Sequence, residues 1–324
     1  MLIDKFNRKV DYLRIGITDR CNLRCRYCMP EQGIDFSSRK ELLTYEEILY
    51  LVRIFKDLGI TKVRLTGGEP LSRKDVDVLI KNIYTHIPNI HITTNATHLE
   101  PFIPLFQEIN LQGLNVSLDS LDRDKFTMIT RRDAFDSVIS NSLSAKKAGL
   151  PVKFNMVVMK GINDMEINDF IEFGMQNDIQ VRFIEAMPFN AFDGNKDVFM
   201  DSKDILNTVM EKYSNVEAKY SNNPSSSVKY TINDSYKFGI IPAYSGTMCG
   251  TCNRIRLTPK GEVLTCLYSE KGINLKDVIR NKEHSEEEII SMVKNLVSNK
   301  LKSGWDEEKL RGDSVFNSMT SIGG

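Results

Sequence analysis

Residues 12–28 read Tyr-Leu-Arg-Ile-Gly-Ile-Thr-Asp-Arg-Cys-Asn-Leu-Arg-Cys-Arg-Tyr-Cys, a short alternating segment that runs directly into three cysteines. The cysteines at 21, 25 and 28 follow the pattern C-x3-C-x2-C, and the next cysteine is at residue 249. A complete four-iron cluster takes four protein thiolates, so a set of three leaves one iron open to a small molecule. The segment therefore predicts a reactive metal centre at the end of a β-strand.

Two other uses of cysteine fit the triplet less well. A closed zinc site needs four nitrogen or sulfur ligands, and all four histidines lie far from the triplet in sequence: His86, His91, His98 and His284. A thioredoxin-like site needs C-x-x-C at the start of a helix, and here a further cysteine precedes that pair. The pattern favours an iron–sulfur cluster.

The other three cysteines form a second group, in which Cys249-Gly250-Thr251-Cys252 is followed by Cys266. From these residues alone, a structural metal site, a disulfide and a second cluster all stay open. A disulfide is disfavoured because no signal peptide opens the chain and the cytosol keeps thiols reduced. We therefore expect a cytoplasmic protein with free thiols.

Composition excludes some classes of partner. The chain has 324 residues, enough for one large domain and an appendage. Lys plus Arg number 43, as do Asp plus Glu, so the net charge gives no reason to expect nucleic acid or an anionic membrane. No apolar run approaches the roughly twenty residues of a membrane span. Residues 222–227, Asn-Asn-Pro-Ser-Ser-Ser, are expected to form a surface loop.

Six short β-rich segments alternate with longer segments of helical character. The β-rich segments lie near residues 12–18, 61–66, 89–94, 112–118, 151–158 and 180–185, and residues 45–58 and 167–176 are examples of the helices. Strands that alternate with helices form βαβ units and a parallel sheet. We predict an α/β fold, with an incomplete (β/α)6 TIM-like barrel over residues 1–190 and an α+β extension over residues 191–324.

Side-chain alternation predicts a polar inner face for this barrel, because successive residues of a strand point to opposite sides. The apolar faces must meet the helices, which leaves a lumen lined by Arg14, Arg64, Thr93, Asn115, Ser117 and Lys153. A complete barrel instead fills its lumen with bulky branched side chains. An antiparallel sheet with one wet face is the alternative. The intervening helices favour an open barrel that holds a large polar ligand.

Functional groups of parallel barrels gather where strands end. The triplet follows the first predicted strand, Gly67-Gly68-Glu69-Pro70 the second, Thr94-Asn95 the third, Asp119 the fourth and Met187 the sixth. Glycine permits close backbone approach, and Glu69 supplies a carboxylate suited to an ammonium group. These residues should meet at one rim.

Residues 21–30, Cys-Asn-Leu-Arg-Cys-Arg-Tyr-Cys-Met-Pro, with Thr66-Gly67-Gly68-Glu69-Pro70, resemble the radical S-adenosylmethionine (SAM) superfamily. The resemblance implies a [4Fe-4S] cluster held by the triplet, with the amino and carboxylate groups of SAM on the open iron. An electron then splits SAM into methionine and a 5′-deoxyadenosyl radical. It also implies SAM contacts by Tyr27, Gly68, Ser117 and Met187, with Glu69 and Asn95 as further candidates.

The second cysteine group narrows the resemblance. Residues 249–257, Cys-Gly-Thr-Cys-Asn-Arg-Ile-Arg-Leu, with Cys266 and the terminal Gly323-Gly324, resemble the GTP 3′,8-cyclases of molybdenum cofactor biosynthesis, as do residues 18–22, 160–164 and 182–185. The resemblance implies a second [4Fe-4S] cluster on Cys249, Cys252 and Cys266, at the opposite end of one cavity from SAM and against the guanine of GTP. Ala96 departs from the glycine frequent in that family, which questions the local backbone shape.

The implied GTP contacts are Arg14, Arg64, Thr93, Lys153, Arg254, Ile255 and Arg256. Arginine suits phosphate, and Arg254 and Arg256 should leave one face of a hairpin strand that turns at residues 259–261. The catalytic candidates are the triplet, Arg254, Arg256 and a tail, Gly323-Gly324, that reaches the active site. An exposed strand face and a frayed terminus are the plainer interpretations.

The expected activity is that of a lyase that converts GTP into (8S)-3′,8-cyclo-7,8-dihydroguanosine 5′-triphosphate, by removal of the ribose 3′ hydrogen and bonding to C8. The expected partners are a flavodoxin- or ferredoxin-type electron donor and a cyclic pyranopterin monophosphate synthase that takes the product, but no nucleic acid or membrane. The chain would be a monomer or homodimer. Alternatives are a peptide or haem-precursor maturase of the same superfamily, a zinc-binding module and a structural nucleotide-binding protein.

Overall fold

Six parallel strands form the centre of the fold. The computed structural model describes the whole chain except residues 188–197, 220–223, 247–248, 312–317 and 323–324. In spatial order the strands are β3 (Tyr12–Gly16), β4 (Lys62–Thr66), β5 (Ile90–Thr94), β6 (Gly113–Ser117), β7 (Val152–Val158) and β8 (Gln180–Glu185), each parallel to its neighbour. The open six-stranded barrel is therefore confirmed, and the antiparallel alternative is wrong.

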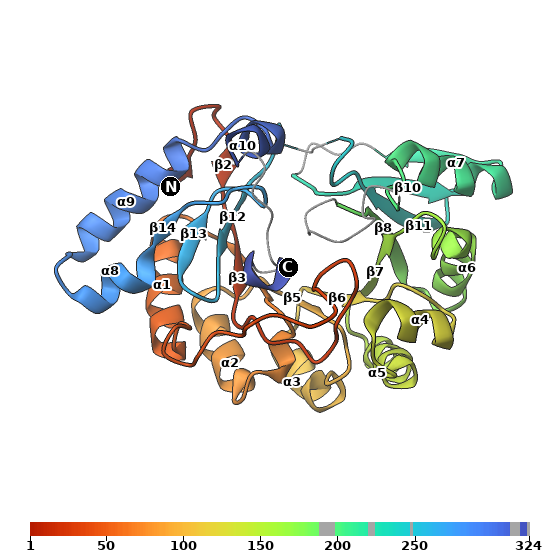
Figure 1. The fold of residues 1–324 in the computed structure, drawn as a ribbon, viewed down its shortest axis with the longest axis horizontal. Coiled ribbons are helices and arrows are strands. Elements are labelled where there is room, and N and C mark those ends of the chain that lie inside the picture. Colours follow the sequence, from red (N-terminus) through yellow and green to blue (C-terminus); the bar gives the residue numbers. More distant parts are fainter. Residues whose placement is uncertain (188–197, 220–223, 247–248, 312–317, 323–324) are drawn as a thin grey trace.

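Helices between these strands cover the outer face of the arc (Figure 1). They are α1 (Tyr45–Asp57), α2 (Val76–His86), α3 (Ile103–Glu108), α4 (Arg123–Thr130), α5 (Phe135–Lys147) and α6 (Ile167–Gln176). The predicted helices 45–58 and 167–176 are α1 and α6. Strand residues that face the helices are fully buried, as Leu13 and Ile15 are in β3. The hydrophobic core thus lies between sheet and helices, which leaves the concave side for polar groups.

The C-terminal region extends both edges of the barrel sheet. At one edge β11 (Tyr236–Ile241) pairs in parallel with β8, and β10 (Val228–Ile232) and β9 (Val216–Lys219) follow it. At the other edge β12 (Arg254–Leu257) pairs in parallel with β3 and continues into β13 (Glu262–Leu264) and β14 (Ile273–Asn274). One sheet of 12 strands results. The predicted domain boundary at residue 190 falls outside the described residues.

The remaining elements lie around this sheet. They are β1 (Leu2–Ile3), β2 (Lys9–Val10), α7 (Ser202–Lys212), α8 (Leu275–Asn281), α9 (Glu286–Ser298) and α10 (Gly304–Arg311), with the 3-10 turns η1 (Pro70–Ser72), η2 (Glu100–Phe102), η3 (Asp164–Glu166) and η4 (Met319–Ile322). The turn η4 lies inside the arc of strands, far in sequence from the barrel that surrounds it (Figure 1). A search of the described helices finds none with the length and apolarity that a membrane crossing requires.

Candidate active site

The parallel pairing of β12 with β3 separates the two cysteine groups. Arg254 lies opposite Tyr12 in register, so Cys252 precedes the start of this strand pair, whereas Cys21 follows its end. The hairpin β12–β13, which turns at residues 258–261 as predicted, returns the chain and brings Cys266 back beside Cys252. The sheet therefore places two sets of three thiols at opposite ends of the strands.

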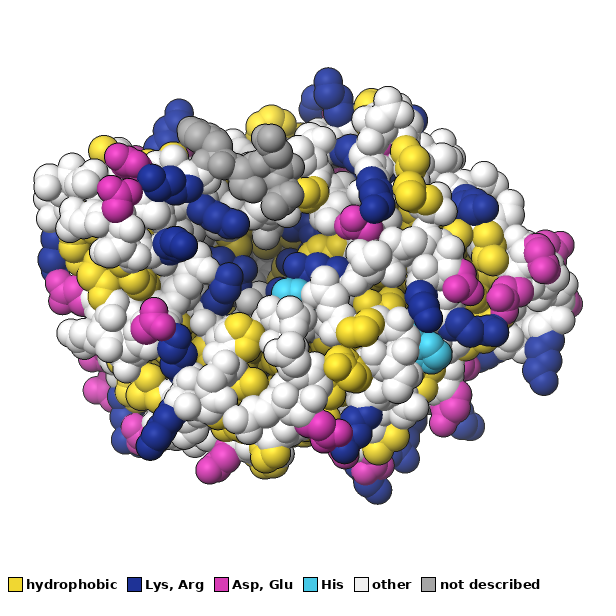
Figure 2. All heavy atoms as spheres, turned by 180° about the vertical axis from the view of Figure 1, so that it is seen from behind, with side chains coloured by type: hydrophobic (Ala, Val, Ile, Leu, Met, Phe, Trp, Pro, Cys, Tyr) yellow, Lys and Arg dark blue, Asp and Glu magenta, His cyan; other side chains and the backbone are white. Residues whose placement is uncertain are grey.

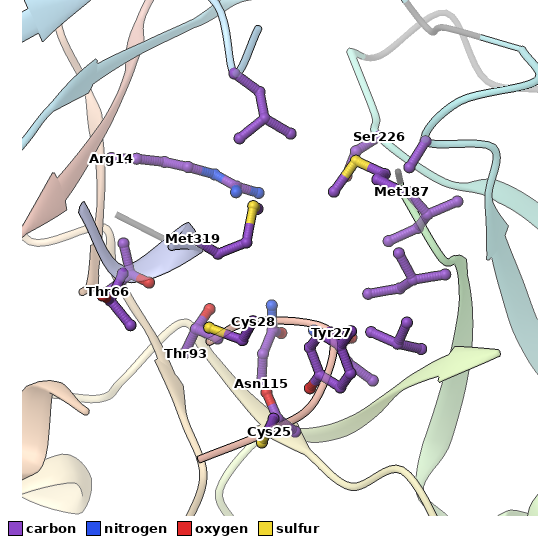
Figure 3. A pocket seen from close by; sticks show the side chains of 18 of the residues that line it. Arg14, Cys25, Tyr27, Cys28, Thr66, Thr93, Asn115, Met187, Ser226 and Met319 are labelled. Carbon is purple, nitrogen blue, oxygen red and sulfur yellow. The ribbon is translucent and has the colours of Figure 1, made fainter. Parts of the chain in front are cut away.

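Both sets line one cavity of about 350 Å³, within the size range of small-molecule sites. Figure 3 shows Cys25, Cys28, Tyr27 and Asn115 at one end of it, with the long side chain of Arg14 pointing across the space. Residues predicted as SAM or substrate contacts that line the cavity are Tyr27, Gly68, Asn95, Ser117, Met187, Arg14, Thr93, Arg254 and Arg256. Alternation along the six strands thus accounts for Arg14, Thr93 and Ser117, and the other six residues reach the cavity from loops or from β12.

Close packing of two glycines fixes the loop before the triplet. The N–H of Gly68 donates to the carbonyl of Thr18 at 2.7 Å, and the N–H of Glu69 donates to that of Arg20 at 2.8 Å. A Cβ at Gly68 would lie 2.1 Å from the Arg20 carbonyl oxygen, and Gly67 has a positive φ of 138°. Only glycine permits this approach.

Polar contacts orient the first thiol set. Asn95 Nδ2 lies 3.7 Å from Cys21 Sγ, and the Tyr27 hydroxyl donates to Asp119 at 2.8 Å. Burial raises the pKa of Cys21 to about 11 and of Cys28 to about 12. Buried thiols of this kind become thiolates when a metal supplies compensating positive charge. The donor set therefore fits a cluster.

Glu69 contacts the backbone of the rim, and its predicted contact with an ammonium group stays a prediction. Glu69 is fully buried and accepts hydrogen bonds from the N–H of Leu71, the hydroxyl of Thr94 and the N–H of Asn95. Two of its three partners, Thr94 and Asn95, line the cavity, although Glu69 itself does not. Burial raises the pKa of Glu69 to about 7. Glu69 therefore holds the loops after β4 and β5 together.

A row of arginines crosses three neighbouring strands. In register, Arg256 of β12 lies beside Arg14 of β3, which lies beside Arg64 of β4. Burial, then the charges of Arg14 and Arg254, lowers the pKa of Arg256 to about 9. Like charges side by side on a sheet destabilise it. The row is therefore suited to a polyvalent anion, and the interpretation of Arg254 and Arg256 as an exposed strand face is wrong, since Arg256 is 7% exposed.

Tyr12 lies within this cluster of cations. Its hydroxyl oxygen is 2.6 Å from Arg64 Nε, and the ammonium of Lys62 lies 4.6 Å from the ring centroid. Burial alone would raise the pKa of Tyr12, but the charges of Arg64, Arg14 and Lys62 outweigh it and bring the value to about 7.

On the face opposite to that of Figure 1, Lys and Arg side chains gather around a central hollow (Figure 2).

Three predicted substrate contacts lie outside the described cavity lining. Arg64 donates to Tyr12, to the carbonyl of Ile92 and to Thr93, so it is a neighbour of the cavity wall. Lys153 lies among Arg182, Lys229 and Arg64, and burial followed by these charges lowers its pKa to about 8. Ile255 alternates with the two arginines of β12 and is fully buried in the core. The predicted contact of the segment 254–256 with the substrate stays a prediction, in which Ile255 takes part through its backbone and not through its buried side chain.

Two residues of the sixth strand were missed as site candidates. Arg182 lines the cavity, and its Nε and Nη2 are buried without a hydrogen-bond partner in the described part of the chain. Glu185 is fully buried and accepts from the N–H groups of Ser202, Tyr244 and Ser245, so it ties the loop after β11 to β8. The alternation that located Arg14 would have found Arg182 in residues 180–185.

The second thiol set lies beside cations. All six cysteines are free. Burial by itself raises the pKa of Cys252, but Arg254 and Lys300 outweigh it and lower the value to about 6. Among the described residues no three ligating side chains converge on a single ion position. The thiols alone therefore do not specify which metal group they bind.

The end of the chain lies against the first thiol set. The N–H of Met319 and the hydroxyl of Ser318 donate to the carbonyl of Cys28, and Arg256 donates to the carbonyl of Ile322 at 3.4 Å. Met319 points into the cavity from η4 (Figure 3). Gly323 and Gly324 lie outside the described residues.

Two local expectations concern the cavity wall. In the predicted surface loop at 222–227, residues 222–223 lie outside the described residues and Pro224 is exposed, but Ser227 is buried, so the prediction is wrong for Ser227; Ser226 lines the cavity. Ala96 has a positive φ of 61°, the left-handed region that glycine adopts most readily. Alanine in place of glycine at this position therefore raises the conformational energy of the backbone.

Comparison with known proteins decides the family. Residues 15–174 match the Radical SAM superfamily model and residues 179–304 match Molybdenum Cofactor Synthesis C. A GTP 3′,8-cyclase of Nautilia profundicola is 40% identical over 314 residues, which is 96% of this chain and 97% of the relative. The chain belongs to the GTP 3′,8-cyclase family. Molybdenum cofactor biosynthesis protein moc-5 of Caenorhabditis elegans is 38% identical over 301 residues, 92% of this chain and 50% of that protein.

Among solved structures, the family's fold resembles that of Streptococcus suis SuiB bound to S-adenosylmethionine. The TM-score is 0.63 at 16% identity, over 97% of this chain and 77% of SuiB. At this identity the likeness concerns the fold. GTP 3′,8-cyclase family membership also makes the chain an enzyme of the radical SAM class, which uses a [4Fe-4S] cluster with SAM.

Proposed function

We propose that the chain converts GTP into (8S)-3′,8-cyclo-7,8-dihydroguanosine 5′-triphosphate, the first step of molybdenum cofactor biosynthesis. The observation that carries the proposal is one cavity with a thiol set at each end and the arginines Arg14, Arg254 and Arg256 between them. A nucleoside triphosphate is a polyvalent anion of the kind that such a row of guanidinium groups binds. Membership of the cyclase family supports the same activity.

The first set would hold the SAM cluster. Cys21, Cys25 and Cys28 supply three thiolates and leave one iron for the amino and carboxylate groups of SAM. When bound, the cluster and SAM supply a 5′-deoxyadenosyl radical. The chain's own residues hold SAM in place: Gly68 allows close backbone approach, and Tyr27, Asn95, Ser117 and Met187 line the adjoining wall.

The second set, Cys249, Cys252 and Cys266, would hold a second [4Fe-4S] cluster against the guanine. Arg14, Arg254, Arg256 and Arg182 would bind the triphosphate, with Thr93 beside them. Arg64 and Lys153 would act from behind the wall by supporting these side chains and by their charge. This arrangement would direct the ribose toward the SAM end and keep the radical within reach of C3′.

The tail would complete the enclosure. Met319 and Thr320 line the cavity and Ser318 is bound to the triplet loop, so Gly323 and Gly324 follow a segment that is already anchored inside. We propose that these two residues enter the active site. Arg254 or Arg256, close to the substrate end, would assist the final proton transfer.

We further propose a cytoplasmic location, a flavodoxin- or ferredoxin-type electron donor, and delivery of the product to a cyclic pyranopterin monophosphate synthase. Six cysteines that serve as cluster ligands and not as disulfide partners fit a reducing compartment. No oligomeric state is favoured between monomer and homodimer. The cysteine pattern predicts about eight irons per chain after anaerobic reconstitution if both clusters form.

Substitution of one cysteine from each set tests the division of roles. With SAM, a reductant and GTP, the reconstituted wild type should form 5′-deoxyadenosine and a cyclised nucleotide. Cys21→Ser should abolish SAM cleavage, whereas Cys249→Ser should keep SAM cleavage and lose nucleotide product. Both products are measured by chromatography and mass spectrometry. Equal loss of SAM cleavage in the two variants would contradict the assignment, as would a wild type with intact clusters that forms no nucleotide product.

A further inference from the structure

Lys300, two residues after the end of α9, has a buried ammonium group next to the second thiol set. The residue is 3% exposed. Its Nζ donates to the carbonyl of Arg254 at 3.1 Å and to the carbonyl of Thr265. Arg254 follows Cys252 by two residues, and Thr265 directly precedes Cys266. The ammonium therefore joins the two sides of the hairpin at its open end, next to Cys252 before β12 and Cys266 after β13.

This cation lacks an acidic partner in the protein. In the described part of the chain, Lys300 forms no ion pair with a carboxylate, and both hydrogen bonds of its Nζ go to neutral carbonyls. The nearby Glu307 carboxylate instead accepts from the hydroxyl of Thr265 at 3.3 Å. A buried charge without a counter-charge is strongly destabilising. Some other group must therefore supply negative charge.

A second buried cation at the same place makes the contrast clear. Arg8, 7% exposed, donates to the carbonyls of Cys249 and Lys302 at 2.8 Å, but its Nε is 2.5 Å from the carboxylate of Asp4. Arg8 is thus neutralised within the protein and serves to anchor the Cys249 loop. Lys300 is not.

The functional groups that adjoin the Lys300 ammonium are thiols. Its two carbonyl partners belong to Arg254, two residues after Cys252, and to Thr265, directly before Cys266, and its charge acts on both cysteines. Arg254 acts on the same thiols, but it lines the cavity, where the proposed substrate anion would also attract it. Lys300 is absent from the described cavity lining, so its charge reaches the hairpin from the protein side.

We propose that Lys300 is the counter-charge of the second thiol set, a positioning residue whose fixed ammonium raises the reduction potential of the cluster that Cys249, Cys252 and Cys266 would hold. The inference rests on the proposed function, which assigns that cluster. Three thiolates around a cluster of charge +2 give a net negative group that becomes more negative on reduction. A fixed ammonium nearby stabilises the reduced form more than the oxidised form.

The test measures the second cluster by itself, in protein that carries Cys21→Ser. Lys300→Met, Lys300→Arg and Lys276→Met are compared by iron content and by redox titration with electron paramagnetic resonance. Lys276 is the matched control: it is 8% exposed and donates to the carbonyl of Glu41 at 2.9 Å, but it packs on Gly261 at the far end of the hairpin.

We expect Lys300→Met to lower the ratio of reduced to oxidised cluster at a given potential about tenfold, which is 59 mV for a one-electron couple. Lys300→Arg should restore the potential, and Lys276→Met should leave it unchanged. If Lys300→Met instead fails to hold iron, retention by Lys300→Arg supports the role of charge. Equal iron loss in both variants overturns the proposal, as does an unchanged potential in Lys300→Met at full iron content.

The outcome separates this inference from the proposed function. If the Cys21→Ser parent with Lys300 intact binds no iron at the second set, the assignment of that cluster fails, and the counter-charge role fails with it. If the parent holds iron and Lys300→Met behaves as Lys276→Met does, only the role of Lys300 is wrong.

Discussion

Arg182 has buried donor groups that the described part of the protein does not satisfy. Its Nε and Nη2 have no hydrogen-bond partner there, and burial followed by Arg64 lowers its pKa to about 9. An unsatisfied buried donor costs about 1–3 kcal/mol, and more when it is charged. The side chain lines the same cavity as the arginine row. Arg182 thus lowers the stability of the ligand-free protein, which is expected of a side chain that binds an anionic ligand.

Arg182→Met should therefore weaken GTP binding and leave the protein equally or more stable. Charge-assisted hydrogen bonds contribute about 1.5–3 kcal/mol, so we expect the KM for GTP to rise about 10- to 100-fold with kcat little changed. Replacement of a buried charge by an apolar side chain is neutral or stabilising by about 1–4 kcal/mol. Steady-state kinetics and thermal denaturation measure the two effects.

Arg53→Met is the control for Arg182→Met, because Arg53 forms an exposed ion pair with Glu286 at 2.6 Å on the outer face. Arg53→Met should leave the KM for GTP unchanged. It should change the free energy of unfolding by no more than about 1 kcal/mol. An Arg182→Met variant with unchanged KM would remove Arg182 from the substrate site.

At the scale of elements, the loop before the first thiol set depends on contact with the turn after β4. Gly68 packs against the carbonyl of Arg20, and a Cβ there would also lie 2.8 Å from the carbonyl of Asp19. Backbone atoms cannot rotate away as a side chain does. Added volume at Gly68 must therefore move the loop that carries Cys21.

We expect Gly68→Ala to lower iron bound at the first set and to prevent SAM binding, while far-UV circular dichroism stays native. Gly250→Ala is a matched control in the second cysteine loop, because a Cβ there meets no atom within 4 Å. Iron content and SAM affinity in the two variants are the measurements. Full iron content and normal SAM affinity in Gly68→Ala would contradict this prediction, because they would mean that the loop can move without loss of cluster or SAM binding.

At the scale of the whole molecule, the two regions share one sheet. The barrel edges β3 and β8 are paired with β12 and β11, which come from the C-terminal region. A chain that stops at residue 190 would expose both edges, and unpaired edge strands promote aggregation. The predicted division at this residue is thus a division of sequence motifs within one sheet.

The chain that stops at residue 190 should therefore aggregate or remain partly unfolded. Size-exclusion chromatography with light scattering, together with far-UV circular dichroism, would measure this against the full chain. A monomer with native secondary structure and a cooperative thermal transition would mean that residues 1–190 form an autonomous domain.

Local pattern was sufficient for the barrel and much of its lining. Alternation with period two marks strands, so the sequence alone could assign Arg14, Thr93, Asn115 and Ser117 to the inner face, and all four line the cavity. The spacing of Cys21, Cys25 and Cys28 likewise identified the first thiol set, because three ligands within one loop depend on short-range geometry, whereas Cys266 joins Cys249 and Cys252 only through the hairpin β12–β13. Arg182 lay within reach of the same reasoning.

Only tertiary structure decided contacts between distant segments. The role of Glu69 depends on Thr94 and Asn95, and the position of the second thiol set depends on the parallel pairing of β12 with β3, which lie near opposite ends of the sequence. Lys300 acts on Cys252 for the same reason. Such contacts arise from global packing and desolvation, which the sequence neighbours of a residue do not encode.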